Sequence, residues 1–328
     1  MNTTAAYNRS TLERLVRSNL GTDLGELDIT PIRTGKHNQS YRILTRLGSY
    51  VLRIAPPDTT GLLFYERRMM RQEPFLHRIL RQHTQLPVAR IISHDFGRAV
   101  IDRDYVLMEM LPGTPLSEAH WLGSAQRARA LEQVGGYLRQ LHALTATEIL
   151  GVAAYGYLGE HHPIPAQPSW QSAFSTMWNR LLDDVVTSGV YRHGEAQVMR
   201  DLLETHLPSF AHTVAPCLLH MDIWDQNILV DDEGNVTGLV DFDRALWGDP
   251  EIEYAVLDYC AISEPAFWSG YGAARDTSPA AEIRRLFYLL YEVQKYMPIA
   301  IWRQDDPAGA LRYKEHSFGL AAALLRSS

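Results

Sequence analysis

The chain has 328 residues, 46% of them hydrophobic and 21% charged, a size that suits two packed lobes rather than one small domain. No apolar stretch approaches the roughly 20 residues of a membrane span, and no signal-peptide pattern opens the chain. Cys217 and Cys260 are the only cysteines, too few for a disulfide framework. We therefore expect a cytoplasmic protein without membrane segments. The net charge of −7 and the lack of a basic stripe argue against nucleic acid as a partner.

The first part of the chain predicts one helix followed by a meander of strands. Residues 10–20 place leucine and valine at helical spacing behind a polar cap. From residue 28 the apolar period shifts toward two, which predicts strands at 29–32, 40–44 and 50–54. The segment therefore predicts an antiparallel sheet with a helix before it.

A helix and two more strands are predicted next. Residues 65–82 have a helical pattern, and Pro74 inside it marks a break or a second start. Strands are predicted around 89–94 and at 104–110. These strands extend the sheet that the meander begins.

A stretch rich in proline and glycine, residues 111–115, is the predicted hinge between two lobes. We therefore predict an N-terminal lobe at 1–110 and a C-terminal lobe at 111–328. The C-terminal lobe is mainly helical in pattern, with long helices predicted at 125–144, 170–188, 195–206 and from 251 onward.

A short hairpin interrupts these helices. Two apolar strands, 228–230 and 236–240, flank an acidic turn that contains Gly and Asn, the residues that tolerate a positive φ. Asn227 lies just before the first strand and Asp241 just after the second. The hairpin therefore brings these two polar side chains to one end.

Asp222, Asn227 and Asp241 have the spacing of a phosphoryl-transfer site. In such a site one carboxylate meets the attacking hydroxyl, while an amide and a second carboxylate hold the Mg²⁺ ions that accompany ATP. We predict Asp222 as the catalytic base and Asn227 and Asp241 as metal ligands. Taken singly each could be a solvated loop residue, and it is the combined spacing that favours catalysis.

The polar neighbours of these three residues have supporting roles in this interpretation. Asp225 does not have the spacing to Asn227 that the motif requires of the base, and it is predicted to be a surface or supporting residue. His220 is predicted to anchor the loop by hydrogen bonds rather than to transfer protons. Asp243 has two possible roles: contact with a metal ion or its waters, or a salt bridge to Arg244 or another local cation.

The region resembles the aminoglycoside phosphotransferase and choline-kinase group of small-molecule kinases. The motif identity is strongest over 217–258, and the layout extends from about residue 28 to 300. Met221 departs from the glycine of the family motif. The resemblance implies an α+β, bilobal, protein-kinase-like fold and a structural role for Asp249. The matching segments are His220-Met221-Asp222 with Asn227, Asp241-Phe242-Asp243 and Gly248-Asp249-Pro250.

The resemblance also implies nucleotide-binding residues in the N-terminal lobe. The loop from Gly35 to Ser40 corresponds to the phosphate loop, where Asn38, Ser40 and backbone N–H groups would contact phosphate oxygens. A single glycine is a weak signal, and an ordinary hairpin loop is the alternative. The adenine is expected against the hinge backbone at Glu109, Met110 and Leu111, between apolar side chains (candidates Val51, Met108, Ile228 and Leu239).

Arg53 stands where family members often carry a lysine for the α- and β-phosphates. Arginine keeps the charge and grips phosphate with two N–H groups. A carboxylate from the following helix is expected to pair with it. Glu66 and Glu73 are the two candidates, and Glu73 is preferred because it precedes an apolar helical run.

The expected acceptor is a small molecule with a hydroxyl group, neutral or cationic in charge. Residues 1–114 hold 16 Lys/Arg against 11 Asp/Glu, whereas residues 115–328 hold 15 against 27. An acidic C-terminal lobe suits a cationic acceptor, although evenly spread surface charge is the plainer interpretation. The candidate pocket residues are Glu251, Glu253, Asp258, Glu264, Trp268, Tyr271 and residues between Tyr288 and Trp302.

The sequence therefore predicts an ATP- and Mg²⁺-dependent O-phosphotransferase. Its acceptors include aminoglycosides and other antibiotics, amino alcohols and sugars. A protein Ser/Thr kinase is a second possibility, but the stretch from Asp241 to Pro250 is brief and no Ala-Pro-Glu motif follows it. A nucleotide-binding module without catalysis is the third, and only the arginine at position 53 favours it.

Overall fold

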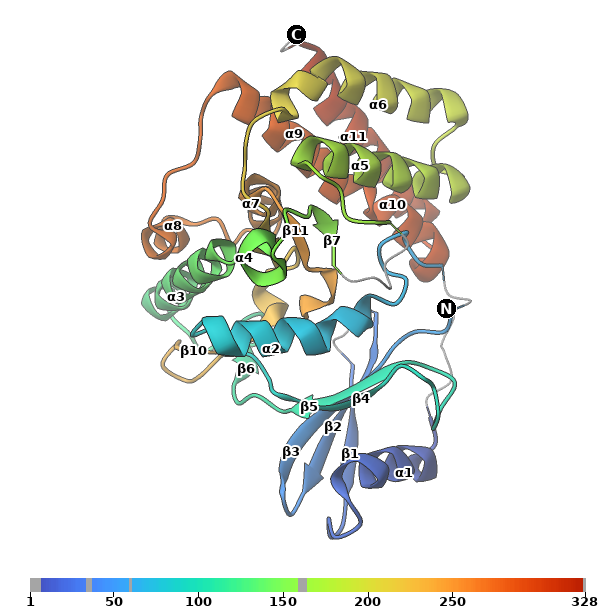
Figure 1. Cartoon of the computed structure of the whole chain (residues 1–328), viewed down its shortest axis with the longest axis vertical. Helices are drawn as coiled ribbons and strands as arrows, with labels where there is room; N and C mark the ends of the chain where they lie inside the picture. Colours follow the sequence, from blue (N-terminus) through green and yellow to red (C-terminus); the bar gives the residue numbers. More distant parts are fainter. Residues whose placement is uncertain (1–6, 34–36, 59–60, 159–163, 327–328) are drawn as a thin grey trace.

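The computed structural model describes residues 7–33, 37–58, 61–158 and 164–326. An antiparallel sheet forms one end of the molecule, the N-lobe, and a group of helices forms the other, the C-lobe (Figure 1). No helix within the described ranges is long and apolar enough to cross a membrane. The architecture is the predicted bilobal α+β fold.

The N-lobe is built on a five-stranded sheet with the order β1-β2-β3-β5-β4 and antiparallel pairing throughout. Tyr41, Ile43 and Leu52 alternate along two of its strands and are buried against helix α1. This helix begins one residue earlier than predicted, because the side chain of Asn8 caps it by accepting from the Thr11 N–H. The elements are α1 (Arg9–Leu20), β1 (Asp28–Ile32), β2 (Gln39–Thr45), β3 (Gly48–Ile54), β4 (Ile91–Asp95) and β5 (Tyr105–Glu109).

The helical pattern at 65–82 contains two elements rather than one. A 3-10 turn, η1 (Met69–Gln72), is followed by α2 (Glu73–His83), which has Pro74 in its first turn, where a missing N–H is tolerated. Helix α2 lies between the sheet and the C-lobe (Figure 1). Its apolar side chains Leu76, Ile79 and Leu80 belong to the same hydrophobic cluster as the C-lobe core.

The chain between β3 and α2 also packs against the C-lobe. The Tyr65 ring stacks on Tyr157 with centroids 5.1 Å apart, and the Phe64 N–H donates to Asp184 at 2.7 Å. The sheet has its own, separate hydrophobic clusters. Leu63, Phe64 and Tyr65 are therefore part of the C-lobe core, whereas Met70 in η1 packs with the sheet.

The C-lobe helices surround two small three-stranded sheets. Helices α3 and α8 approach so closely that a Cβ atom on Gly135 or Gly270 would lie within about 2.1 Å of a backbone oxygen of the other helix. The helices are α3 (Ser124–Ala143), α4 (Ala146–Leu150), α5 (Trp170–Thr187), α6 (His193–His206), η2 (Leu207–Phe210), α7 (Pro250–Tyr259), α8 (Pro265–Tyr271), α9 (Pro279–Gln294), α10 (Tyr296–Ile299), the π-helix η5 (Ala300–Gln304) and α11 (Pro307–Arg326).

The small sheets position the loops at the lobe interface. The predicted hairpin is present, and its turn uses Gly234 at φ = +80°. One sheet has the order β10-β9-β6 and the other β7-β11-β8. Their strands, with two connecting 3-10 turns, are β6 (Thr114–Pro115), β7 (Gly156–Tyr157), β8 (Cys217–Leu219), η3 (Asp225–Asn227), β9 (Ile228–Val230), β10 (Val236–Leu239), η4 (Phe242–Arg244) and β11 (Leu246–Gly248).

Candidate active site

The loop between β8 and β9 forms the first part of the candidate site. Its backbone turns sharply at Met221, where φ is +68°, a conformation that costs a non-glycine residue roughly 1–2 kcal/mol. The buried carboxylate of Glu253 on α7 offsets this cost by accepting from the backbone N–H groups of His220 at 3.1 Å and Met221 at 2.7 Å. His142 on α3 donates to the same carboxylate at 2.7 Å. A buried charged acceptor therefore holds the loop in its turn.

Asp222 and Asn227 lie next to each other at the end of this loop. The Asn227 amide nitrogen donates to the Asp222 backbone oxygen at 2.8 Å and to its carboxylate at 3.0 Å. His220 accepts from the Asp222 N–H at 3.2 Å and donates to the Val240 carbonyl at 3.1 Å. His220 thus anchors the loop, as predicted. Burial raises the pKa of Asp222, and Lys295 opposes the rise.

The hairpin places Asp241 beside this loop. Asp241 is in the left-handed region at φ = +70°, and its carboxylate accepts from Arg53 on β3 at 2.5 Å. The same guanidinium nitrogen lies 3.2 Å from the Asp243 carboxylate. Asp243 therefore pairs with Arg53, another local cation, and Arg244 next to it has a different partner. Residues that are far apart in the sequence meet here across the two lobes.

Arg53 also pairs with a carboxylate from α2. Its second terminal nitrogen lies 2.8 Å from both carboxylate oxygens of Glu73, which is fully buried. Glu66, the other candidate, instead accepts from Arg303 at 2.6 and 2.7 Å. The preferred pairing of Arg53 with Glu73 is therefore the one that the structure contains.

One guanidinium thus serves three carboxylates, the buried Glu73 and Asp243 and the partly exposed Asp241. Burial raises the pKa of Glu73 to about 7, and burial together with Asp241 raises the pKa of Asp243. Burial opposes ionisation of Asp241, but Arg53 outweighs it and lowers the pKa of that carboxyl. The excess of negative charge and the all-oxygen donors, Asn227 included, fit a Mg²⁺ ion. In the described ranges no three His, Cys, Asp or Glu side chains could hold a metal by themselves, so phosphate oxygens would complete such a site.

The loop before β2 reaches the same carboxylates. The Asn38 amide nitrogen donates to Asp243 at 3.0 Å, and Ser40 lines the space in front of Arg53. Gly35, the remaining residue predicted for this loop, lies outside the described residues. Asn38 therefore lies beside the charged cluster, and Ser40 faces the cleft that contains it.

The predicted adenine site lies at the hinge, where Glu109, Met110 and Leu111 line the cleft. Two of the backbone donors there are already used: the Glu109 N–H donates to the Arg90 carbonyl and the Met110 N–H to the Ser49 carbonyl, each at 3.0 Å. Adenine would therefore have to bond to other backbone groups of the hinge, such as the carbonyls of Glu109 and Met110 or the Leu111 N–H.

The residues proposed to contact nucleotide, metal or acceptor face one cleft between the lobes, with a volume of about 1180 Å³, whereas Glu73, His220 and Glu253 are not among the residues that line it. Val51, Met108 and Leu239 line it on the hinge side, whereas Ile228, the fourth predicted apolar contact, is buried outside the lining. A cleft of this size with an apolar end and a few convergent charged groups is typical of a small-molecule site.

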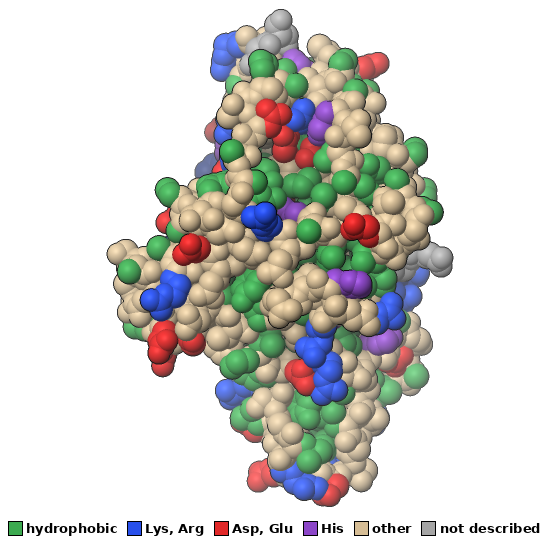
Figure 2. Space-filling model, turned by 60° about the vertical axis from the view of Figure 1, so that its left-hand side comes forward, with side chains coloured by type: hydrophobic (Ala, Val, Ile, Leu, Met, Phe, Trp, Pro, Cys, Tyr) green, Lys and Arg blue, Asp and Glu red, His purple; other side chains and the backbone are tan. Residues whose placement is uncertain are grey.

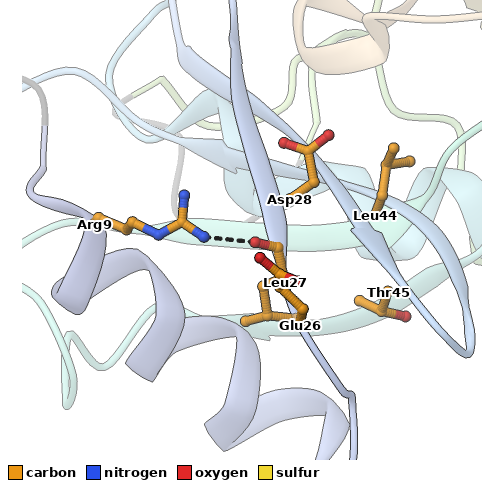
Figure 3. Close-up of a pocket in the computed structure, with 6 residues that line it drawn as sticks. All are labelled: Arg9, Glu26, Leu27, Asp28, Leu44 and Thr45. Atoms are coloured by element: carbon orange, nitrogen blue, oxygen red, sulfur yellow. Dashed lines mark hydrogen bonds between the residues drawn. The ribbon is translucent and has the colours of Figure 1, made fainter.

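A second, shallower pocket lies on the N-lobe between the start of α1 and the β1–β2 pair (Figure 3). Arg9 there donates to the Leu27 carbonyl at 2.6 Å, with Glu26, Asp28 and Thr45 around it. None of the predicted catalytic residues is among those that line it. On the face of the molecule in Figure 2, basic and acidic side chains are interspersed with hydrophobic ones rather than gathered by sign.

The acidic residues predicted for the acceptor pocket are engaged elsewhere and do not line the cleft. Glu253 lies beneath the catalytic loop. The other three each pair with an arginine from a distant segment: Glu251 with Arg284 at 2.7 Å, Asp258 with Arg275 at 2.8 Å and Glu264 with Arg127 at 3.3 Å.

The predicted aromatic residues of α8 also face away from the cleft. The Tyr271 hydroxyl bonds to His142 at 2.8 Å and to Tyr254 at 2.7 Å, and the Trp268 indole donates to Ser263 at 2.9 Å. Asp225 pairs with a surface arginine of α3, in keeping with its predicted supporting role. Asp249 caps α7 and accepts from the Tyr288 hydroxyl at 2.8 Å, a structural role.

The predicted range between Tyr288 and Trp302 does reach the acceptor side of the cleft, where it contributes Lys295, Tyr296 and Ile299, but the sequence assigned no role to the charges found there. Arg244 donates to the Met221 carbonyl at 2.7 Å and pairs with Glu292 of α9 at 2.8 Å. Lys295 lies 2.5 Å from the same glutamate and faces the cleft. The helical spacing of Glu292 and Lys295 was the only signal for this group, and it is common in helices of any function.

Three comparisons with known proteins agree with this geometry. The model of the phosphotransferase enzyme family matches residues 28–287. A Lactiplantibacillus plantarum protein named "Probable ketoamine kinase" is 26% identical over 270 residues, covering 80% of this chain and 85% of the relative. A chloroplastic protein-ribulosamine 3-kinase of rice (Oryza sativa subsp. indica) is 36% identical over a shorter stretch, 32% of this chain and 28% of the relative.

Solved structures share the fold. A candidate fructosamine-3-kinase from Haemophilus somnus superposes with a TM-score of 0.70 at 17% identity, covering 96% of this chain and 97% of the other. A thermostable mutant of aminoglycoside phosphotransferase APH(4)-Ia, in a ternary complex with AMP-PNP and hygromycin B, has a TM-score of 0.64 at 17% identity and covers 97% and 98%. The chain belongs to the phosphotransferase enzyme family and has the protein-kinase-like fold of its small-molecule kinases.

Proposed function

We propose that the protein transfers the γ-phosphate of ATP directly to a hydroxyl group of a small molecule, in a Mg²⁺-dependent reaction with Asp222 as the base. The observation that carries the proposal is the convergence of Asp222, Asn227, Asp241 and Arg53 in one interlobe cleft, with Arg53 held by the buried Glu73. The AMP-PNP and GDP complexes of structural relatives support a nucleotide in this cleft.

Asp222 orients the acceptor hydroxyl and takes up its proton late in the transfer. Its carboxylate is held by the Asn227 amide and its backbone by His220, so that little reorganisation is needed when the hydroxyl arrives. In-line transfer to a positioned hydroxyl requires no covalent enzyme intermediate.

Asp241 and the amide oxygen of Asn227 are the proposed metal ligands. Bound Mg²⁺ would neutralise charge on the β- and γ-phosphates. The Arg53 guanidinium, fixed by Glu73, faces the same space and would grip the α- and β-phosphates, with Asn38 beside it. Gly35, Ser40 and the hinge residues complete the proposed nucleotide site.

The names of the relatives favour sugar-derived acceptors. Several curated relatives are named ketoamine or ribulosamine kinases, and the solved structures add aminoglycoside phosphotransferases. We therefore propose ketoamines first, with aminoglycosides, amino alcohols and sugars as the remaining panel.

The test is Mg²⁺-dependent ATP consumption over this panel by the wild type, Asp222→Asn and the control Asp232→Asn. Asp232 is an exposed aspartate in the turn of the same hairpin. Loss of a positioned base costs roughly 10²- to 10⁴-fold in kcat, so Asp222→Asn should lose nearly all transfer while still binding Mg·ATP, and Asp232→Asn should not. Undiminished transfer by Asp222→Asn would remove Asp222 from the mechanism.

A further inference from the structure

The side chain of Gln72 holds the backbone turn that follows Asp241. Gln72 is the last residue of η1, directly before α2, and is 3% exposed. Its amide nitrogen lies 2.5 Å from the carbonyl oxygen of Asp243, 3.2 Å from that of Phe242 and 3.3 Å from that of Ala245. An amide NH₂ group has two hydrogens, so the three carbonyls share them. One buried side chain therefore fixes the turn η4, which begins immediately after Asp241.

Asp241 has a backbone conformation that is uncommon for a residue other than glycine. Its φ is +70°, and such a conformation persists only where the surrounding structure determines it. The Val240 N–H donates to the Asn227 carbonyl at 3.1 Å and fixes the chain just before Asp241. Gln72 fixes the chain just after it. These two contacts therefore determine the direction in which the Asp241 carboxylate points.

The side-chain contact of Asp241 is of a different kind. Its carboxylate accepts from Arg53, and Arg53 is the residue proposed to grip the α- and β-phosphates. A guanidinium that turns to phosphate gives up part of its hold on this carboxylate. Gln72, in contrast, directly precedes α2, which packs on the C-lobe, and it donates to backbone carbonyls rather than to a proposed metal ligand. The hold of Gln72 on the turn therefore remains when Arg53 engages the nucleotide.

Gln72 and Glu73 are consecutive residues with complementary contacts. The Glu73 carboxylate fixes Arg53, and the Gln72 amide fixes the turn after Asp241. The junction between η1 and α2 thus sets the separation between a proposed phosphate-binding cation and a proposed metal ligand. Gln72 is not among the residues that line the cleft, so it acts through the turn and without touching nucleotide or acceptor.

We infer that Gln72 is a positioning residue for the metal: its amide keeps Asp241 in the conformation in which the carboxylate binds Mg²⁺. The inference rests on the proposed function and adds to it a buried residue to which the sequence assigned no role. A glutamine that served stability alone would change the Tm of the protein when replaced. A glutamine that positions Asp241 also changes the affinity that the metal adds to nucleotide binding.

Nucleotide binding with and without the metal tests this role independently of turnover. Titration calorimetry measures the Kd of AMP-PNP in EDTA and in excess Mg²⁺, and the ratio of the two values is the gain in affinity that the metal provides. Gln72→Met keeps the length of the side chain but has no N–H donor. It should lower this gain about 10-fold or more, while the Kd in EDTA stays unchanged. An equal gain in wild type and variant, or no gain in the wild type, overturns the inference.

Gln171→Met is the matched control. The Gln171 amide also donates to a backbone carbonyl, that of Leu207 at 2.9 Å, but it lies on α5, outside the cleft. This variant should have a lower Tm and the full gain from the metal. A gain that falls as far in Gln171→Met as in Gln72→Met contradicts the inference. If Gln72→Met does not fold, Gln72→Asn gives the same comparison, because its amide is one methylene short of the turn, and an unchanged gain again overturns the inference.

Turnover separates this inference from the proposed function. With nucleotide and Mg²⁺ in excess, Gln72→Met should lower kcat about 10-fold or more and leave the KM for the acceptor unchanged. A higher KM for the acceptor with an unchanged gain from the metal overturns the inference but leaves Asp222-dependent transfer intact. A gain that falls in Gln72→Met, although the wild type transfers phosphate to no acceptor, has the opposite meaning: the positioning role holds and the proposed function fails.

Discussion

Replacing Met221 by glycine would restore the residue that the family motif carries, and we predict that it destabilises this protein. Met221 has a left-handed backbone, but its side chain is fully buried in the C-lobe core. Removing a buried methionine side chain costs about 2–5 kcal/mol, and glycine adds roughly 0.5–1 kcal/mol of backbone entropy. Relief of the left-handed strain returns only about 1–2 kcal/mol. The net loss is therefore about 3 kcal/mol.

Alanine at the same position separates the two contributions. Met221→Ala loses the packing but keeps the left-handed cost, so it should be no more stable than Met221→Gly. At ordinary positions alanine is the more stable residue by roughly 0.5–1 kcal/mol. The expected order of stability is therefore wild type first, then glycine, with alanine equal to glycine or below it.

Urea denaturation followed by tryptophan fluorescence measures this order, since the chain has seven tryptophans. Glycine that matches or exceeds the wild type would refute the claim that core packing outweighs backbone strain here. Alanine more stable than glycine by the ordinary margin would refute the claim that the left-handed conformation is costly. Either result can be read from the midpoints of the three transitions.

Two more predictions concern buried groups near the site. Glu253→Gln presents an amide NH₂ to one of the donors around it, such as the Met221 N–H. Because each hydrogen bond to a charged group contributes roughly 1.5–3 kcal/mol, this variant should have a kcat at least about 10-fold lower and a lower Tm than the wild type. An unchanged kcat would contradict the role of Glu253 in holding the loop. Burial lowers the pKa of His77 to about 4 from 6.5. As the pH falls, His77 therefore binds a proton in the unfolded chain before it does so in the folded protein. The free energy of unfolding should then decline between pH 6.5 and pH 4 by up to about 3 kcal/mol. His77→Asn keeps a donor for the Ala89 carbonyl, and its Tm should fall less over this range than that of the wild type; parallel Tm curves would contradict the assignment.

The sequence predicted most of the elements, because their signals are local. Alternation along β2 and β3, the Gly and Asn of the β9–β10 turn and the long helical pattern of α3 are each contained in a short window. The packing of Phe64 and Tyr65 on the C-lobe could not be read in this way. Their partners, such as Tyr157 on β7, lie far away in the sequence and have no shared pattern.

The same distinction between local and distant contacts applies to the residues of the candidate site. The spacing of Asp222, Asn227 and Asp241 could be recognised because one hairpin sets it. The pairing of Arg53 with Glu73 required a choice between two glutamates. In the structure α2 begins at Glu73, and this position brings the Glu73 carboxylate to Arg53.

Most of the acceptor residues predicted by name were wrong, because their contacts are not local in the sequence. Glu251, Asp258 and Glu264 have the charge expected of an acceptor site, but each is neutralised by an arginine from another segment. A sequence shows that a carboxylate exists and does not show which cation it meets. Lys295 falls within the predicted range between Tyr288 and Trp302, but it carried no motif that would single it out from the other residues of that range.

The packing of residues 63–65 and α2 on the C-lobe has a mechanical consequence. These residues share the C-lobe core, whereas β3 and β4 belong to the sheet with its own clusters, so the boundary between the two parts is crossed between Ile54 and Leu63, between His83 and Ile91, and at the hinge. Arg53 and Glu73 lie on opposite sides of that boundary. Rotation of the sheet away from the C-lobe would therefore pull this ion pair apart, and its formation would act as a gauge of domain closure that is built into the nucleotide site itself.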